Sequence, residues 1–380
     1  MTKYLLVFIS FIVSSFTDVS EAEILQNIIV NPSALTTFYN SLEKSDKGTC
    51  SIVHIGDSHI QANFLTGSIR NSFQNKFGNA GRGFVFPYRI AQSRGALDID
   101  ISYSGNWQYC NVMRNADVCN LGVAGFSVTS SPTSRFALNV ANKAEMNSSF
   151  NKIKFFDANG SFQPTNVDGS YILQKENDRT VIYFDKLQDS LELKPVIKKN
   201  TMPELQGMVL ENGHSGILYH SMGVNGSGTI QYLRSIGFEN QIKELDASLV
   251  VVSFGTNDCY VPSSKFCVNC VKDRYRTIIA RLRSANPQAS ILLTTPPDHY
   301  FMRKYPNINV SKLRDALYEL SREENVALWD LYYVMGGENS IINWRDKKLA
   351  SRDLVHFTKE GYQKQGDMFF EALMGEYPAH

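Results

Sequence analysis

A serine near one end of the chain and an aspartate–histidine pair near the other are the residues best suited to do chemistry together. Ser58 lies in the tetrapeptide Gly56-Asp57-Ser58-His59, and Asp353 precedes His356 by three positions. At that spacing the carboxylate can meet the imidazole on one turn and orient it. A serine hydroxyl is a weak nucleophile until such an imidazole takes its proton. The three residues therefore predict acyl transfer through a covalent serine intermediate, although Ser58 alone would serve equally well as a helix cap.

Two further segments could supply hydrogen-bond donors for the oxyanion that forms when a serine attacks an ester carbonyl. One is GVNGSG at 223–228, and the other is GTND at 255–258. We expect three donors, namely the backbone N–H groups of Ser58 and Gly226 and the side-chain amide of Asn257, because such donors often make the largest catalytic contribution. Both segments also have a structural interpretation: Gly226 would suit any tight turn, and Asn257 could cap a loop with Asp258 as its solvated neighbour.

The elements that must position these residues alternate between strand and helix. Apolar segments predict buried strands, and helix-compatible segments separate them. Ser58, Gly226 and Asn257 each follow a strand, where open parallel sheets bind their ligands. The pattern predicts a three-layer α/β/α domain around a parallel five-stranded sheet. The predicted strands are 51–55, 217–219, 249–254, 291–295 and 326–330, and the predicted helices are 31–42, 64–77, 273–285, 310–325 and 359–374.

The stretch 91–213 breaks this rhythm and predicts an inserted domain that divides the α/β domain into 23–90 and 214–380. The stretch is rich in Ser, Asn, Thr and Gly. Several short runs of alternating character within it suggest a β-sandwich. Three aromatic residues of the insert could form a sugar-stacking face or could belong to the sandwich core. These residues are Tyr103, Trp107 and Tyr109, and the alternating runs are 134–140, 152–156, 179–184 and 190–194.

In this order the motifs resemble those of the SGNH hydrolase superfamily, also called the GDSL esterases. The resemblance implies a flavodoxin-like sheet and assigns the four letters of the family name to Ser58, Gly226, Asn257 and His356. It adds Asp353 as the third member of a catalytic triad. It also favours Gly226 over Gly223 as the oxyanion glycine.

The resemblance is more specific around the serine. The motif reads GDSH followed by Ile60 and Gln61, instead of GDSL, and a β-rich insert comes after the first helix. This layout is similar to that of the peptidoglycan O-acetylesterases of Gram-negative bacteria, whose insert is similar to a carbohydrate-binding module. It implies a serine esterase that removes O-acetyl groups from a cell-envelope glycan, with peptidoglycan as the first candidate, and it places His59 and Gln61 where they could shape the substrate. A glycan O-acetyltransferase, another carbohydrate or aryl esterase, and an inert glycan-binding protein remain alternatives.

Composition and the N-terminal residues limit the class and location of the protein. The chain has 380 residues, of which 43% are apolar and 20% charged, and a formal net charge of +1. These are the values of a globular protein without the basic surplus that nucleic-acid binding needs. Residues 1–22 have the pattern of a secretory signal peptide, with Lys3 before the apolar stretch 4–13 and with small residues at Ser20 and Ala22. The apolar stretch is shorter than the roughly 20 residues that span a bilayer, so we expect a periplasmic or secreted protein with no stable membrane span.

Six cysteines fit an oxidising compartment. Cys110 and Cys119 are close enough in sequence to pair locally. Cys259, Cys267 and Cys270 share the segment after the GTND motif, so at least one of them is left without a partner there. The Cys-x-x-Cys spacing has no second pair of ligands, which favours a disulfide over a zinc site. We expect neither a metal nor a cofactor.

Overall fold

The structure of the protein is a computed structural model, and it describes residues 26–114, 116–141, 148–158, 160–177, 179–197 and 201–377. The predicted signal peptide, 1–22, lies outside the described residues. Among the residues that are described, no helix combines the length and the apolar character needed to cross a membrane.

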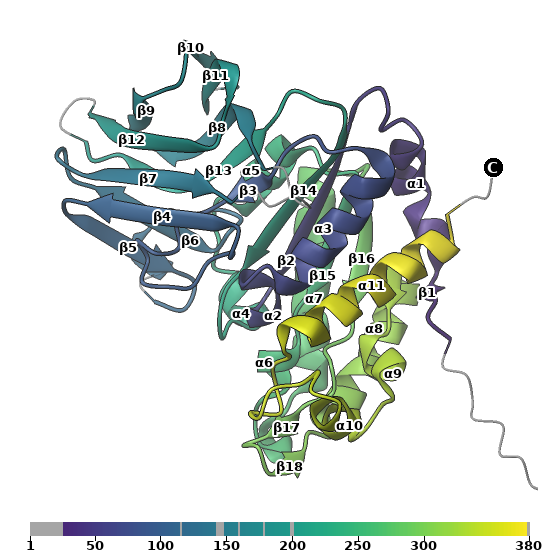
Figure 1. Ribbon diagram of the computed structural model, residues 1–380. Coiled ribbons are helices and arrows are strands. Elements are labelled where there is room, and N and C mark those ends of the chain that lie inside the picture. The colour runs from purple at the N-terminus through teal and green to yellow at the C-terminus, as the bar shows by residue number, and fades with distance from the viewer. Residues whose placement is uncertain are drawn as a thin grey trace, which may run out of the picture.

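A six-stranded sheet forms the centre of the α/β domain (Figure 1). Its order is β1–β19–β16–β15–β2–β14, with five parallel strands and β1 antiparallel at one edge. The predicted five-stranded parallel sheet is confirmed, and β1 is an addition, because a strand of two residues is too short to show a pattern in the sequence. The strands are β1 (Ile29–Val30), β2 (Thr49–Gly56), β14 (Gly216–Gly223), β15 (Leu249–Ser253), β16 (Ser290–Thr294) and β19 (Ala327–Trp329).

The winding of this sheet reverses between β2 and β15. Taken in chain order, the parallel strands lie as 2-1-3-4-5, which is the flavodoxin-like order, and ligands of such sheets bind beyond the carboxyl ends of the strands at the reversal. The pairing register aligns the carboxyl ends of β2, β14 and β15 at this point. Gly56 of β2 pairs with Gly223 of β14 on one side and with Ser253 of β15 on the other. The segments that follow these three ends are therefore neighbours in space.

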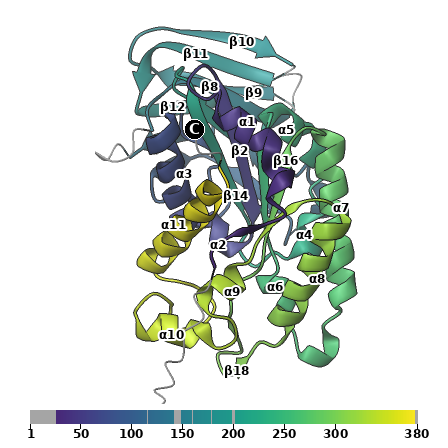
Figure 2. The ribbon, with the colours of Figure 1, turned by 90° about the vertical axis from the view of Figure 1, so that its right-hand side faces the viewer.

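Helices cover both faces of the sheet (Figures 1 and 2). Along β15, Val250 and Val252 pack in the cluster that contains α5, α7 and α8, whereas Leu249 and Val251 pack in the cluster that contains α1, α3 and α11. All four side chains are fully buried, which explains why the central strands are almost continuously apolar. The helices are α1 (Thr36–Leu42, after a 3₁₀ turn at Pro32–Leu35), α2 (Ser58–Gln61), α3 (Phe64–Phe77), α4 (Thr229–Tyr232), α5 (Phe238–Leu245), α6 (Thr256–Cys259), α7 (Val268–Ala285), α8 (Asn309–Glu323), α9 (Leu331–Met335), α10 (Ser340–Asp346) and α11 (Lys359–Gly375).

The second domain is built from antiparallel sheets, as the sequence predicts (Figure 1). One sheet has the order β10–β11–β8–β13–β6–β5, with β3 also paired to β13, and the other has the order β4–β7–β12–β9. We call β4 to β13 the insert. Its strands, with β3, are β3 (Gly83–Val85), β4 (Ile99–Ser104), β5 (Trp107–Asn111), β6 (Phe126–Ser130), β7 (Arg135–Val140), β8 (Phe150–Ala158), β9 (Gly160–Asn166), β10 (Tyr171–Glu176), β11 (Arg179–Gln188), β12 (Ser190–Ile197) and β13 (Glu204–Glu211).

Aromatic side chains from the two sheets of the insert meet in its core. The rings of Phe155 and Trp107, from one sheet, lie 6.2 and 6.3 Å from that of Phe162, from the other. Tyr103 lies on β4, in the opposite sheet from Trp107 and Tyr109. The suggestion that these three residues form one sugar-stacking face is therefore wrong, because the backbone divides them between two sheets and Trp107 packs inwards.

A buried ion-pair cluster fastens the start of the insert to α3. The carboxylate of Asp98 contacts Arg82 Nε at 2.5 Å and Arg70 Nη2 at 2.9 Å, and all three side chains are 3% exposed. Burial alone would raise the pKa of Asp98, but the two guanidinium groups lower it well below its usual value. β3, which lies between Arg82 and Asp98 in the chain, pairs with β13. The α/β domain and the insert are thus joined by the pairing of β3 with β13 and by the ion pairs of Asp98. These contacts involve α3, the helix that follows α2 and Ser58.

Candidate active site

The turn between β2 and α2 holds Ser58 at the carboxyl edge of the sheet. Asp57 caps α2, because its carboxylate accepts a hydrogen bond from the backbone N–H of His59 at 3.0 Å and its carbonyl accepts one from Gln61 at 3.2 Å. Asp57 is 1% exposed, and burial raises the pKa of its carboxyl to about 7, against the lowering effect of the His59 bond. Asp57 shapes the turn, as the bonds show, and leaves Ser58 partly exposed as the first residue of α2.

The three residues of the predicted triad form a hydrogen-bonded chain. Ser58 Oγ lies 2.9 Å from His356 Nε2, and His356 Nδ1 lies 2.8 Å from Asp353 Oδ2. The other carboxylate oxygen of Asp353 accepts bonds from the backbone N–H groups of Val355 and His356, each at 3.0 Å. Leu354 has a φ of 58°, which is left-handed and turns the chain tightly enough for His356 to reach back. One carboxylate therefore fixes both the loop and the imidazole.

The electrostatic environment suits a base that works near neutral pH. The hydrogen bond to Asp353 raises the pKa of His356, and partial burial of the imidazole opposes only part of this rise. Burial would raise the pKa of Asp353, but hydrogen bonds from the side chain and backbone of His356 lower it well below its usual value. Asp353 therefore stays ionised, and it can stabilise the imidazolium that forms when His356 takes a proton.

Gly226 occupies the third position of a tight turn at the end of β14. Ser227 N–H donates to Val224 O at 3.1 Å and closes the turn. Gly226 has a φ of 78°, whereas Asn225 is not left-handed, and this combination is that of a type II turn. A type I turn, without the positive φ, would point the N–H of Gly226 to the opposite side. Glycine is therefore required for the direction of this donor, and among the described residues its N–H has no protein acceptor.

The two glycines of the GVNGSG segment serve different purposes. A Cβ on Gly223 would lie 2.4 Å from the backbone nitrogen of Gln61 and 2.5 Å from the carbonyl oxygen of Asp57, so Gly223 allows β14 and α2 to pack closely. A Cβ on Gly226 would meet a single heavy atom within 4 Å, Met113 Cε at 3.8 Å. Gly226 thus borders open space, where an acyl group could be accommodated.

Asn257 and Asp258 tie the loop after β15 to the same turn. Asn257 donates from Nδ2 to the carbonyl of Ser227 at 3.0 Å, and its amide carries a second N–H. The side chain of Asp258 is 1% exposed and accepts bonds from the backbone N–H and the hydroxyl of Thr229. The interpretation of Asp258 as a solvated residue is therefore wrong. The buried carboxylate of Asp258 accepts the first N–H of α4, that of Thr229. This bond fixes the start of α4, which follows the Gly226 turn.

His59 and Gln61 both have buried positions. His59 is 7% exposed, its Nδ1 lies 2.9 Å from the hydroxyl of Tyr362, and its ring centroid is 5.3 Å from that of His356. Burial lowers the pKa of His59 well below its usual value, so the ring is neutral. The ring of His59 packs against that of His356. It is buried and does not face solvent, whereas a side chain that shapes the substrate would have to. Gln61 is 3% exposed and lines a cleft of about 510 Å³ between α2 and the start of the insert.

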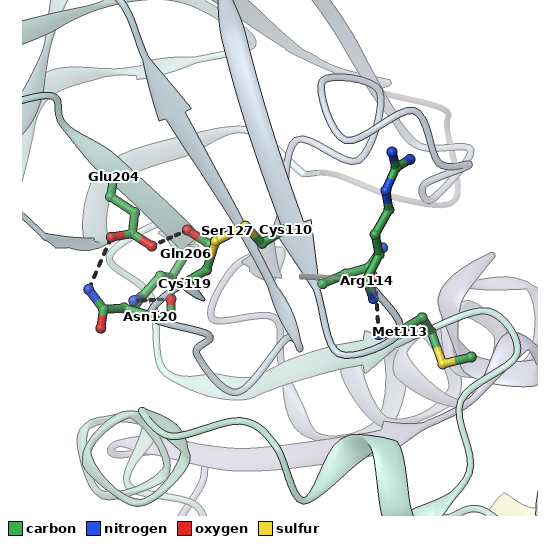
Figure 3. The surroundings of a disulfide bond; sticks show 9 residues. Cys110, Met113, Arg114, Cys119, Asn120, Ser127, Glu204 and Gln206 are labelled. Carbon is green, nitrogen blue, oxygen red and sulfur yellow. Dashed lines mark hydrogen bonds between the residues drawn. A yellow bond between two sulfur atoms is a disulfide. The ribbon is translucent and has the colours of Figure 1, made fainter. Parts of the chain in front are cut away.

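The insert reaches the candidate site through the loop between β5 and β6. Figure 3 shows the disulfide of this loop and its surroundings. Cys110 and Cys119 form the predicted local disulfide at the base of this loop, which carries Met113. Behind it, a Cβ on Gly125 would lie 2.8 Å from Val224 Cγ2, so the loop packs directly on the first residue of the Gly226 turn. No motif in the sequence marks this contact, because it joins two segments that are distant in the chain and ordinary in composition.

A second disulfide joins Cys267 and Cys270 at the start of α7, and Cys50 and Cys259 are free and buried. The bond accounts for the Cys-x-x-Cys spacing, and the unpaired cysteine of that segment is Cys259. In the described parts of the chain, no three His, Cys, Asp or Glu side chains are grouped so that they could hold a metal ion.

Comparison with known proteins shows which protein family this chain resembles. Residues 202–364 match the model of the GDSL-like lipase/acylhydrolase family. The match covers less than half of the chain and includes the segments that carry Gly226, Asn257, Asp353 and His356. It indicates that the protein is an esterase. No curated protein sequence matches the chain.

The fold of the whole chain, insert included, has a counterpart among solved structures. A structure entitled "Peptidoglycan O-acetylesterase in action, 5 min" is 22% identical, with a TM-score of 0.71, and the alignment covers 91% of this chain and 98% of that one. A lipase/acylhydrolase from Enterococcus faecalis and the acetyl xylan esterase AlAXEase are 23% and 20% identical. They align with 42% and 41% of this chain and with 77% and 81% of their own, each with a TM-score of 0.34.

The pH dependence of the acylhydrolase domain should follow His356. Because Asp353 raises the pKa of His356, we expect kcat/KM for p-nitrophenyl acetate to rise with pH through an acid limb above about 6.5, the ordinary histidine value. In Asp353→Asn the limb should move to lower pH, since the imidazolium loses its partner, and kcat should fall by about 10³ to 10⁴. Stopped assays between pH 5 and 9 would measure both effects. The exposed His214 provides a control: His214→Gln should keep the wild-type profile, and a limb unmoved in Asp353→Asn would contradict the pairing.

Proposed function

We propose that the protein is a serine esterase that removes O-acetyl groups from a cell-envelope glycan, and that this glycan is peptidoglycan. The observation that carries the proposal is the hydrogen-bonded chain from Ser58 through His356 to Asp353, beside a backbone N–H at Gly226 that has no protein acceptor in the described chain. The proposed nucleophile, base and oxyanion donor thus lie together at the carboxyl edge of the sheet.

In the proposed mechanism, His356 Nε2 takes the proton of Ser58 as Oγ attacks the acetyl carbonyl. The negative charge that forms on the carbonyl oxygen is met by the N–H groups of Ser58 and Gly226 and by the free N–H of Asn257. Protonated His356 then gives its proton to the departing sugar oxygen, which leaves an acetyl group on Ser58. A water molecule, activated by the same imidazole, releases acetate and restores the serine.

Two observations support the choice of substrate. The solved structure that shares the fold over nearly the whole chain is named as a peptidoglycan O-acetylesterase. The insert is not a separate appendage, since its β5–β6 loop packs on the turn that carries Gly226 and the cleft beside Gln61 lies between the two domains. An O-acetylated glycan strand is a substrate large enough to contact both domains.

We further propose that the protein acts in the periplasm or outside the cell. Residues 1–22 have the composition of a signal peptide, and two disulfides in one chain are typical of proteins from oxidising compartments.

A glycan O-acetyltransferase would use the same residues and would differ only in the acceptor that resolves the acetyl-enzyme. An esterase for another carbohydrate or for an aryl ester would differ only in its substrate contacts. An inert glycan-binding protein would have no use for the intact chain of Ser58, His356 and Asp353. Among the described residues, no contact favours any of these three over a peptidoglycan O-acetylesterase.

The test is acetate release from O-acetylated peptidoglycan, acetylated xylan and an acetylated lipid, measured side by side with purified protein. We expect the highest rate with peptidoglycan, and a loss of at least about 10³-fold in Ser58→Ala. Ser311→Ala, which changes a half-buried serine of α8, should behave as wild type. A higher rate with xylan or the lipid would replace the substrate assignment, and acetate production undiminished in Ser58→Ala would refute the mechanism. Acetyl groups that appear on a second sugar instead of in water would identify a transferase.

A further inference from the structure

Gln61 connects the Gly226 turn to the segment that leads into the insert through both ends of its side-chain amide. Its Oε1 accepts a hydrogen bond from the backbone N–H of Asn225 at 2.6 Å. Its Nε2 donates to Ser93 Oγ and to the carbonyl of Arg94, each at 2.6 Å. The residue is 3% exposed, so these bonds are shielded from competing water.

The bond from Asn225 acts on the Val224–Asn225 peptide, which directly precedes the peptide that contains the proposed oxyanion donor. Between a type I and a type II turn, the ψ angle of the second turn residue changes by about 150°, and the peptide that follows it is inverted. In this turn the second residue is Asn225, and the peptide that follows it carries the N–H of Gly226. The bond to Gln61 holds the preceding peptide, Val224–Asn225, from which this donor peptide extends, and so fixes the position of the turn that carries the N–H of Gly226.

Other bonds anchor the two ends of the turn within the acylhydrolase domain. Val224 N–H donates to Gly56 O at 3.1 Å, and the carbonyl of Ser227 accepts the bond from Asn257. The bond from Asn225 to Gln61 holds the middle of the turn, and Gln61 is in turn held by Ser93 and Arg94.

We propose that Gln61 is a positioning residue of the oxyanion site, which holds the first peptide of the turn and so fixes where the N–H of Gly226 lies, and which is itself held by the segment that leads into the insert. This rests on the proposed serine mechanism, because it assigns the Gly226 N–H to the oxyanion. Gln61 touches neither the hydroxyl of Ser58 nor the imidazole of His356 in the bonds described, so its effect passes through the turn.

Two substitutions separate the two ends of the Gln61 side chain. Gln61→Met preserves the length of the side chain but removes every hydrogen bond. We expect it to lower kcat for p-nitrophenyl acetate by about 10- to 100-fold, with KM within about twofold, because an oxyanion donor acts in the transition state. Gln61→Glu keeps an acceptor for Asn225 and loses the donor to Arg94, so it should retain kcat within about fivefold of wild type.

Gln241→Met is the matched control for a purely structural loss. Gln241 is 1% exposed, and its Oε1 accepts a bond from the backbone N–H of Val123 at 2.8 Å, which joins α5 to the β5–β6 loop of the insert. It should lower the melting temperature without the fall in kcat. The proposal is overturned if Gln61→Met keeps kcat within threefold of wild type, or if Gln241→Met loses as much kcat at the same loss of melting temperature.

If Ser58→Ala is also active, the serine mechanism itself fails. An inactive Ser58→Ala beside a fully active Gln61→Met refutes only the positioning role.

A different contact carries a second inference, about the size of the acyl group. Met113 Cε is the heavy atom that a side chain on Gly226 would meet, and Met113 is 43% exposed. The backbone around it is fixed, since Asn111 Oδ1 accepts bonds from the N–H groups of Met113 and Arg114 at 3.0 and 2.8 Å. The Cys110–Cys119 disulfide closes the same loop, as Figure 3 shows. An apolar side chain is thus held in place beside the open space next to the proposed oxyanion donor.

We infer that Met113 forms a wall of the acyl pocket and restricts the enzyme to short acyl groups such as acetyl. This deepens the proposed function, because it assigns the acyl preference to a residue of the insert. In Met113→Ala, the ratio of kcat/KM for p-nitrophenyl butyrate to that for the acetate should rise by at least about 10-fold, the effect expected for one or two methylene groups in an apolar pocket. Met113→Leu should keep the wild-type ratio.

Val118→Ala is the control, because Val118 lies in the same loop and is 80% exposed. A ratio unchanged in Met113→Ala, or raised equally in Val118→Ala, would overturn the inference. Because the readout is a ratio of two artificial esters, it does not depend on which glycan is the natural substrate. Failure of the peptidoglycan assignment and failure of the acyl wall are therefore distinguishable.

Discussion

The hydrogen bond of 2.9 Å between Ser58 Oγ and His356 Nε2 is the interaction on which the rest of the structure depends. It joins residues separated by 298 positions in the chain, and a displacement of about 1 Å at such a site can cost about 100-fold in rate. Each partner is therefore held locally. Asp57 caps the turn that presents Ser58, and Asp353 uses both carboxylate oxygens to hold the loop and the imidazole of His356. The backbone N–H of Tyr300 adds a bond of 2.9 Å to Leu354 O, which fixes the histidine loop from outside.

The proposed oxyanion side of the site is held in a different way, by contacts between strand ends and across domains. Level ends of β2, β14 and β15 bring the Gly226 turn and the Asn257 loop beside Ser58. Gln61, Asn257 and Asp258 then bind the turn or the helix that follows it, and the loop between β5 and β6 packs against Val224. The insert is consequently part of the frame of the site. This gives a physical reason why a β-domain can interrupt the α/β domain after α3, since the interruption adds contacts at the candidate site.

Local patterns in the sequence predicted the fold well where a pattern extends over many residues. The helix predicted at 64–77 is α3, Phe64–Phe77, and the apolar run before GDSH is the buried strand β2. The strand ends follow from the same runs, so the meeting of Ser58 with the two later motifs could be anticipated from the topology of parallel sheets. The strands β1 and β3 were missed, because they have two and three residues and depend on pairing with distant strands.

The parts of the site that sequence did not predict are those decided by distant partners. Whether Asp258 faces solvent or Thr229 depends on where α4 lies, and whether His59 faces a substrate or Tyr362 depends on α11. The bridge through Gln61 needs the position of Ser93 and Arg94, and the place of Met113 needs the packing of Gly125 on Val224. None of these contacts is encoded by spacing along the chain, so they become visible only when the domains are assembled.

The most direct measurement of the central claim is covalent labelling with a sulfonyl fluoride, followed by mapping of the modified residue by mass spectrometry. The Ser58–His356 pair predicts a single modified residue, Ser58, and labelling that accelerates with pH as His356 loses its proton. His356→Ala should react at least about 10³-fold more slowly. Modification of another residue, or equal labelling rates in wild type and His356→Ala, would contradict the pairing of this serine with this histidine.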